Sequence, residues 1–175
     1  GDFITALLAQ AFLLKAPGST IIYDLRASNA VRDIVAAHGG TSLMNRVGHA
    51  FFKKRMRETN GIFGGEVTGH YYFRDNFFAD NGFIPALLIL ELMSKQGKSL
   101  RDLLEPLREK YFISGEINTK LSSMAAVQPK LDQIAAQYKD ARQYTLDGIS
   151  VEYPDWHFNV RASNTEPLLR LNLEA

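Results

Sequence analysis

The sequence predicts a three-layer α/β domain with a mixed, mostly parallel sheet, followed by a small α+β domain with an antiparallel sheet. Helical patterns alternate with short β-branched runs as far as residue 110, which is typical of parallel α/β folds. Beyond residue 111, one strand and one helix precede several short alternating runs, as in α+β folds. The 175 residues, 46% of them hydrophobic, can bury one good core or two small ones. We therefore expect two domains, 1–112 and 113–175.

The first domain opens with a helix, because Leu7, Leu8, Phe12 and Leu13 recur at helical spacing before the break at APGS. The run Thr20 to Leu25 is β-branched and typical of a buried strand. The elements expected next are a helix over Ser28 to His38, a strand over Thr41 to Asn45, a basic helix over Gly48 to Glu58, a strand over Gly61 to Glu66, and helices over Asn81 to Met93 and Leu100 to Lys110.

The second domain begins with the strand ISGEIN and continues into a helix expected over Ser122 to Tyr138. Four short runs with strand-like alternation follow it: Gln143 to Leu146, Ile149 to Tyr153, Trp156 to Val160 and Leu168 to Leu173. Short strands in succession favour an antiparallel sheet.

The overall composition excludes several classes of protein. Twenty basic and 19 acidic side chains leave a formal charge of +1, so neither nucleic acid nor an anionic membrane is an expected partner. The absence of cysteine excludes disulfides and thiolate catalysis. The apolar stretch Phe3 to Leu14 is too short to span a bilayer, and we expect a cytoplasmic protein. Both ends of the chain resemble cuts through a longer protein.

The segment RASNTEP, residues 161–167, has the chemistry of a phosphate site. Arg161, Ser163, Asn164 and Thr165 offer a guanidinium, two hydroxyls and a carboxamide beside backbone N–H groups. A plain hairpin turn is the alternative, because Ser, Asn and Thr are common turn residues. Either way, the segment is expected to connect the last two strands.

Arg170 lies in the strand that follows this segment. Its guanidinium is expected either to pair with Glu166 or to add a second cation to the phosphate site. The ion pair with Glu166 is slightly favoured.

The segment GGEVTGH, residues 64–70, offers a carboxylate, a hydroxyl and an imidazole at Glu66, Thr68 and His70. This mixture of donors and acceptors suits sugar hydroxyls. In extended chain the three side chains point the same way, so that one ligand can meet all three. The alternative is a loop with a solvated Glu66.

Further candidates lie at the expected ends of strands and helices. His49 begins the basic helix, where a structural role is the alternative, and Arg26 follows a strand, where a surface ion pair is the alternative. The basic helix face of Lys53, Lys54, Arg55 and Arg57 is expected to be solvated or to contact another domain.

Other chemistry has weaker support in the sequence. Asp75, Asp80 and His70 are neighbours in the chain, but their spacing fits no zinc or calcium pattern, and we expect no metal site there. No nucleophile elbow, Walker loop or dinucleotide fingerprint is present.

With these motifs in hand, the chain resembles the C-terminal half of a phosphomannomutase/phosphoglucomutase, a member of the α-D-phosphohexomutase superfamily. GEVTGH resembles the sugar loop GE-x-SGH of the family's third domain, and RASNTEP resembles the phosphate loop R-x-SNTEP of its fourth domain. The resemblance covers essentially all 175 residues. It implies that the second domain has a TATA-box-binding-protein-like fold.

The resemblance also implies roles for individual residues. Sugar hydroxyls would contact Glu66, Thr68, His70, His49 and Arg26, and the distal phosphate would contact Arg161, Ser163, Asn164 and Thr165. Thr68 stands where relatives usually have Ser, and Arg26 where many have Lys. Val67 and Asn164 differ from the residues usual in phosphoglucosamine mutases, which favours mannose or glucose phosphates.

By the same resemblance, the parent enzyme interconverts hexose 1- and 6-phosphates through a phosphoserine and a glucose or mannose 1,6-bisphosphate intermediate. Its Mg²⁺ and its serine would belong to N-terminal domains, because neither a serine loop nor an Asp-rich loop occurs in this sequence. The expected partners are hexose phosphates and those N-terminal domains, and the chain alone is expected to be inactive. The alternative is a non-catalytic phosphosugar-binding or regulatory module. A nucleic-acid binder is a weaker third possibility, which the charge opposes.

Overall fold

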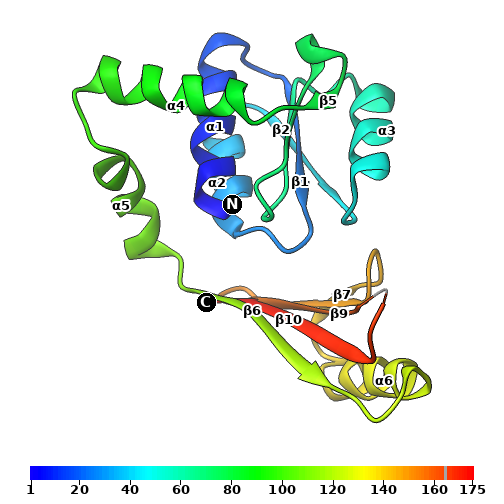
Figure 1. The fold of residues 1–175 in the computed structure, drawn as a ribbon. Helices are drawn as coiled ribbons and strands as arrows, with labels where there is room; N and C mark the ends of the chain where they lie inside the picture. Colours follow the sequence, from blue (N-terminus) through cyan, green and yellow to red (C-terminus); the bar gives the residue numbers. More distant parts are fainter. Residues whose placement is uncertain (164) are drawn as a thin grey trace. The chain divides into compact units, whose positions relative to one another are not determined.

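A computed structural model describes residues 1–163 and 165–175 of the chain. The chain forms two compact units, Gly1–Tyr111 and Phe112–Ala175. Each unit has its own sheet and its own buried core (Figure 1). Within the described residues, no helix is both long and apolar enough to cross a membrane.

The first unit alternates helices with short strands. Its elements are α1 (Asp2–Lys15), β1 (Thr20–Asp24), α2 (Asn29–Ala37), β2 (Thr41–Asn45), α3 (His49–Thr59), β3 (Phe63–Gly65), β4 (Tyr71–Phe73), the 3-10 turn η1 (Arg74–Asn76), β5 (Ala79–Asp80), α4 (Phe83–Gln96) and α5 (Leu100–Lys110). The strand order is β2-β1-β3-β4-β5. Strand β1 runs parallel to β2 and β3, whereas the β3, β4 and β5 ladder is antiparallel.

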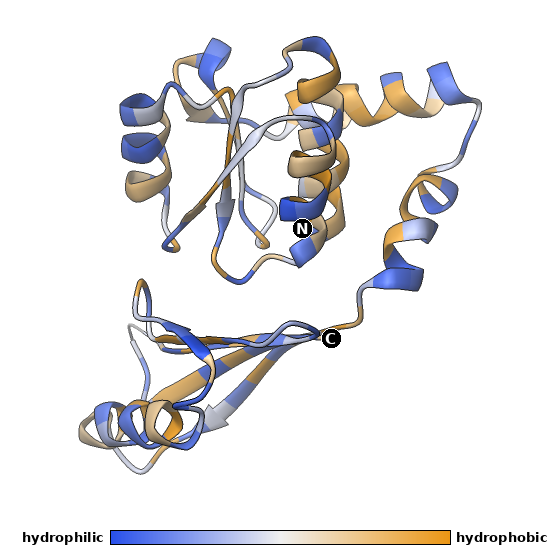
Figure 2. Ribbon diagram, turned by 180° about the vertical axis from the view of Figure 1, so that it is seen from behind, coloured by the Kyte–Doolittle hydropathy of each residue, from blue (hydrophilic) through white to orange (hydrophobic). Residues whose placement is uncertain are grey.

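The first unit has three layers, with α1 and α2 on one face of the sheet and α3 on the other (Figure 1). Alternation along β1 sends Ile21 and Tyr23 into the core beneath α1, and Ile22 into the core beneath α3. Figure 2 shows α1 as mainly hydrophobic and α3 as mainly hydrophilic. Helix α3 therefore buries only one stripe, formed by Phe52 and Met56, and leaves its basic side chains outside.

The second unit places one helix on a five-stranded antiparallel sheet. Its elements are β6 (Ile113–Lys120), the 3-10 turn η2 (Met124–Ala126), α6 (Val127–Gln137), β7 (Arg142–Tyr144), β8 (Ile149–Glu152), β9 (His157–Ala162) and β10 (Leu168–Glu174). The strand order is β6-β10-β9-β8-β7.

The two faces of this sheet differ in polarity. Phe158 and Val160 of β9 and Leu169 of β10 belong to the core beneath α6. The intervening residues of β9 and β10 point to the opposite face, where Arg161 stands directly opposite Arg170. This second face therefore carries polar and charged side chains.

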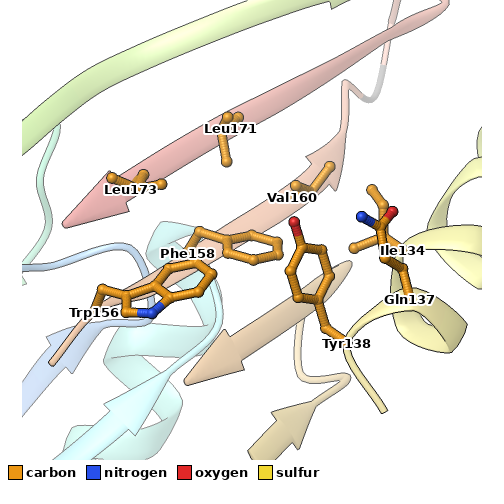
Figure 3. Close-up of a pocket in the computed structure, with 8 residues that line it drawn as sticks. All are labelled: Ile134, Gln137, Tyr138, Trp156, Phe158, Val160, Leu171 and Leu173. Carbon is orange, nitrogen blue, oxygen red and sulfur yellow. The ribbon is translucent and has the colours of Figure 1, made fainter. Parts of the chain in front are cut away.

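An apolar cavity of about 250 Å³ lies beside α6 in the second unit (Figure 3). Tyr138, Trp156 and Phe158 line it with aromatic rings, and Leu171 and Leu173 close it from β10. None of the residues that the sequence suggested for sugar or phosphate binding lines this cavity. Its chemistry does not suit a phosphorylated sugar, which needs charged and hydrogen-bonding partners.

The predicted fold class is confirmed, with a mixed, mostly parallel sheet followed by an antiparallel one. Two strands of the first unit were not predicted, because β4 and β5 have three and two residues and are too short to show a period. The sequence predicted a single helix over Ser122 to Tyr138. Its predicted start is wrong, because the 3-10 turn η2 precedes α6 there.

Candidate functional site

The 64–70 loop begins in the last two residues of β3 and leads to β4 through a tight turn. The Glu66 N–H donates to the His70 carbonyl at 2.9 Å, and the Gly69 N–H donates to the Glu66 carbonyl at 3.0 Å. Gly69 has a φ of +85°, which residues with a side chain rarely adopt. The expectation of extended chain is therefore wrong here, because a reversal with paired strands on both sides satisfies more backbone groups than an isolated strand end.

Glu66 is buried within this turn, with only 2% of its surface exposed. Its carboxylate accepts a short hydrogen bond from the Tyr72 hydroxyl. Burial raises the pKa of Tyr72, and the hydrogen bond to Glu66 and its negative charge raise that pKa further. Because the hydroxyl keeps its proton, Glu66 keeps a fixed donor that holds its carboxylate in one orientation. The alternative of a solvated Glu66 is excluded.

A buried ion pair lies beside the same turn. Arg26 Nε donates to Asp24 Oδ1 at 3.0 Å and to Oδ2 at 3.1 Å, and Arg26 Nη2 also contacts Oδ2. The side chains are 3% and 0% exposed, so the expected surface ion pair is in fact a buried one. The Val67 N–H donates to Asp24 Oδ2 at 3.4 Å. Asp24 thus connects the end of β1 to the 64–70 loop.

Two histidines gather on the exposed side of the turn. The rings of His49 and His70 have centroids 4.3 Å apart, and Thr68 Oγ1 lies 2.9 Å from His70 Nδ1. His49 comes from the first turn of α3, whereas Thr68 and His70 belong to the 64–70 loop. Both of those loop residues are exposed. The structure therefore brings three polar side chains from two segments to one surface.

Asp80 of β5 faces this group. Its Oδ1 lies 2.9 Å from Lys53 Nζ and 3.6 Å from His49 Nδ1. The hydrogen bond from Lys53 lowers the pKa of Asp80, and the nearby charge of Lys53 and His49 adds to that effect. Asp80 is therefore a carboxylate at neutral pH and lies within ion-pair distance of the His49 ring.

The 161–167 loop begins in the last two residues of β9 and leads to β10, in keeping with the connection that the sequence predicts. Ser163 is 3% exposed, and its backbone N–H donates to the Leu168 carbonyl at 3.0 Å. The Thr165 N–H donates to Ser163 Oγ at 3.4 Å, while the Thr165 side chain is exposed. Asn164, also predicted to bind phosphate, lies outside the described residues.

Two arginines of this unit converge on one carboxylate. Arg161 and Arg170 are directly opposite each other on β9 and β10. Arg170 Nη1 donates to Glu116 Oε1 at 2.8 Å, and Arg161 Nη2 lies 3.9 Å from Glu116 Oε2. The predicted ion pair between Arg170 and Glu166 is therefore wrong. The antiparallel register of β6 and β10 instead brings Glu116 to Arg170, from 54 positions away in the sequence.

The basic face of α3 is mainly solvated, in keeping with one of the two expectations. Lys54 pairs with Glu58 at 3.8 Å, and the Arg57 guanidinium lies 5.7 Å from the centre of the Phe78 ring. Lys53 is the exception, because it holds Asp80.

Sequence reasoning missed the residues that support the two loops. Tyr72 was detectable, because an aromatic run directly after a Gly-containing turn is a hairpin signal, and such a hairpin pairs Tyr72 with Gly64. Asp24 and Glu116 gave no comparable signal, since their partners are set by the fold and by strand register.

Comparisons with known proteins agree with this architecture. Residues 1–111 match the model of phosphoglucomutase/phosphomannomutase alpha/beta/alpha domain III, and residues 116–175 match that of the phosphoglucomutase/phosphomannomutase C-terminal domain. The fold and the two matched models thus define the class of protein, in which an α/β/α domain is followed by an antiparallel α+β domain. The chain belongs to the phosphoglucomutase/phosphomannomutase family.

Individual relatives extend this result. A phosphomannomutase of Escherichia coli is 47% identical over 177 residues, which cover 100% of this chain and 38% of the relative. A crystal structure of a phosphoglucomutase/phosphomannomutase family protein from Burkholderia thailandensis has a TM-score of 0.84 at 31% identity, covering 99% of this chain and 37% of that one.

A third similarity is one of fold alone. N-acetylphosphoglucosamine mutase of Aspergillus fumigatus, solved in complex with glucose 1,6-bisphosphate, has a TM-score of 0.62 at 14% identity, covering 100% of this chain and 40% of that one. The chain therefore spans about two fifths of the length of these relatives.

Proposed function

We propose that this chain is the hexose-phosphate recognition half of a phosphohexomutase. The first unit contacts sugar hydroxyls through the 64–70 loop, and the second unit contacts the phosphate that does not react through the 161–167 loop. The parent enzyme interconverts hexose 1-phosphate and hexose 6-phosphate. The names of the relatives that align with the whole chain support this assignment.

The observation that carries the proposal is a pair of arginines, Arg161 at the start of the 161–167 loop and Arg170 opposite it on β10. Arg161 and Arg170 already share one anionic group, the Glu116 carboxylate. Two guanidinium groups that converge on one anion favour a phosphate, because each can donate two hydrogen bonds in a fixed plane. Ser163 and Thr165 add hydroxyls at the turn.

The 64–70 loop supplies the complementary chemistry for a sugar. The Glu66 carboxylate accepts hydrogen bonds from hydroxyls, while Thr68, His70 and His49 each offer a group that can donate or accept. Arg26 was expected to contact the sugar directly, but its guanidinium is engaged by the Asp24 carboxylate. We assign it instead to holding Asp24, which in turn holds the loop through Val67.

The parent reaction is proposed to use a phosphoserine and a glucose or mannose 1,6-bisphosphate. The glucose 1,6-bisphosphate complex of the Aspergillus fumigatus protein supports the bisphosphate. A bisphosphate must be held in two orientations, so that either phosphate can lie away from the reacting centre. Separate sugar and phosphate contacts suit this requirement, because the phosphate contacts are the same for both ends. This chain's residues bind and orient, and the phosphoryl transfer itself takes place on residues of the parent beyond it.

Mg²⁺ does not fit the residues of this chain. Among the described residues, His49, Glu66 and His70 form a group of three potential ligands. Two imidazoles and one carboxylate do not suit Mg²⁺, which prefers oxygen ligands and keeps several waters. We therefore assign the Mg²⁺ of the parent to its other domains and expect this chain to be inactive alone.

Replacing Arg161 by Ala tests the proposal. The loss of a charge-assisted contact should weaken glucose 1-phosphate binding by about 1.5 to 3 kcal/mol, which is about 10-fold to 150-fold. Calorimetric titration measures it, with mannose 1-phosphate as a second ligand. Arg142→Ala is the matched control, because Arg142 is exposed on β7, an edge strand two strands away from β9 in the same sheet. Equal affinities of the two variants would remove Arg161 from the site.

A further inference from the structure

One cluster near the 64–70 loop has chemistry beyond sugar recognition. His49, Glu66 and His70 each offer one ligand atom, and these atoms lie within 4.8 Å of one another. They come from three positions, the first turn of α3 and the two sides of the 64–70 loop. Two imidazoles and a carboxylate are a ligand set that zinc sites with an open fourth position use.

Each of the three potential ligands also has an outer partner. The Tyr72 hydroxyl donates to Glu66, Thr68 Oγ1 lies 2.9 Å from His70 Nδ1, and Asp80 Oδ1 lies 3.6 Å from His49 Nδ1. Outer partners of this kind fix the ring orientation and the tautomer of metal-binding histidines. Because both histidines use Nδ1 for these contacts, both keep Nε2 for an ion.

The spacing of the cluster needs only a small adjustment. Ligand atoms about 2.0 to 2.2 Å from a tetrahedral Zn²⁺ are themselves separated by roughly 3.3 Å. The His49 side chain is 46% exposed and His70 is exposed, so both rings have room to shift toward an ion while they keep their Nδ1 contacts. Glu66 is buried and provides a fixed point.

The charges around the cluster are compatible with a divalent cation. Glu66 and Asp80 face it with carboxylates, and Lys53 provides the opposing positive charge. Lys53 is already held by Asp80 at 2.9 Å, so its charge is partly neutralised there. The remaining carboxylate, Glu66, favours an ion.

We propose that His49, Glu66 and His70 form a binding site for a divalent transition-metal ion of the Zn²⁺ type. The ion takes three protein ligands and leaves a fourth position to water. As a consequence that rests on the proposed function, the bound ion withdraws Glu66, His49 and His70 from sugar hydroxyls. Zn²⁺ is therefore an inhibitor of hexose-phosphate binding that acts through the first unit.

Calorimetric titration of the 175-residue chain with Zn²⁺ alone tests the site. We expect one tight ion per chain, and a loss of affinity of about tenfold or more in each of His49→Ala and His70→Ala. His38→Gln is the matched control, because His38 is also in the first unit but contacts Gln10 and the carbonyl of Ile34. An unchanged Zn²⁺ affinity in both alanine variants, or an equal loss in His38→Gln, would overturn the site.

Tyr72→Phe provides a second test that keeps all three ligands. Removing the hydroxyl that orients Glu66 should weaken Zn²⁺ binding by about 10-fold to 100-fold. Circular dichroism identifies the folded fraction of each variant, so that affinities are compared between folded proteins. Equal affinity of folded Tyr72→Phe and the unchanged chain would contradict the role of the outer partner.

Competition separates the metal site from the proposed function. Glucose 1-phosphate should bind less tightly to the Zn²⁺-loaded chain than to the metal-free chain, and His70→Ala should lose this difference. If Zn²⁺ binds through the two histidines but glucose 1-phosphate does not bind the metal-free chain, the proposed function fails for this chain and the metal site stands. If glucose 1-phosphate binds equally with and without bound Zn²⁺, the inhibitory role is overturned.

Discussion

Both units place an acidic residue against arginine beside a candidate loop, but they do so at different depths. In the first unit, Asp24 and Arg26 are 0% and 3% exposed at their side chains. In the second, Glu116 is 28% exposed and meets Arg170 and Arg161, which are 31% and 12% exposed. Because the Asp24–Arg26 pair is buried, we assign it a structural role. The ion pairs of Glu116 are reached by water, so Arg161 and Arg170 can exchange this carboxylate for another anion.

Removing the two carboxylates in turn should give the largest contrast. Asp24→Ala removes the carboxylate that holds the buried Arg26 guanidinium and should lower the free energy of unfolding of the first unit by about 3 to 5 kcal/mol. Glu116→Ala removes a partner that water reaches, and should change the free energy of unfolding of the second unit by about 1 kcal/mol or less. Urea unfolding followed by amide NMR signals of each unit measures both. Similar losses in the two variants would contradict the distinction.

The next effect is a dependence of stability on pH that arises from Tyr71 on β4, the strand after the 64–70 loop. Burial raises the pKa of Tyr71 to about 12, with a smaller contribution from the charge of Asp2. Because the folded pKa exceeds the unfolded value of about 10, the stabilisation is complete below about pH 10 and is lost as pH rises toward about 12. The loss amounts to at most about 2.7 kcal/mol for two pKa units.

Unfolding measurements from about pH 9 to about pH 12 test this dependence on Tyr71. Tyr71→Phe has no ionising hydroxyl, so its stability should fall less steeply over that range than that of the unchanged chain. Equal slopes for the two proteins would show that Tyr71 does not titrate with a raised pKa.

The smallest effect sharpens the comparison at the 161–167 loop. Glu116→Gln keeps the size of the side chain but removes the charge that competes with a ligand for the two arginines. Glucose 1-phosphate should therefore bind about 1.5-fold to 5-fold tighter, in line with the small energies of exposed ion pairs. Calorimetric titration measures the change, and weaker binding would indicate that Glu116 positions the arginines instead of competing for them.

The sequence was most informative where a pattern is long or where chemistry is concentrated. The apolar spacing in α1 and the β-branched run in β1 predicted those elements, because periodicity over many residues is a strong signal. The position of the 161–167 loop between the last two strands was also predicted, because its turn-forming residues lie between two strand-like runs.

Other features depended on contacts that no local pattern encodes. A Gly-flanked glutamate such as Glu66 is usually solvated, and its burial follows from the hairpin that brings Tyr72 beneath it. The meeting of Glu116 with Arg170 depends on antiparallel register across 54 positions. The burial of the Arg26 ion pair could not be predicted for the same reason, because only the packed fold buries its carboxylate partner.

The most direct measurement is an NMR titration of the isotope-labelled chain with glucose 1-phosphate, and separately with glucose and with inorganic phosphate. The account predicts that glucose 1-phosphate shifts the signals of both Thr68 and Ser163, and that inorganic phosphate shifts Ser163 while leaving Thr68 in place. Shifts confined to residues outside the 64–70 and 161–167 loops, such as the basic face of α3, would contradict the assignment of sugar and phosphate recognition to these two loops.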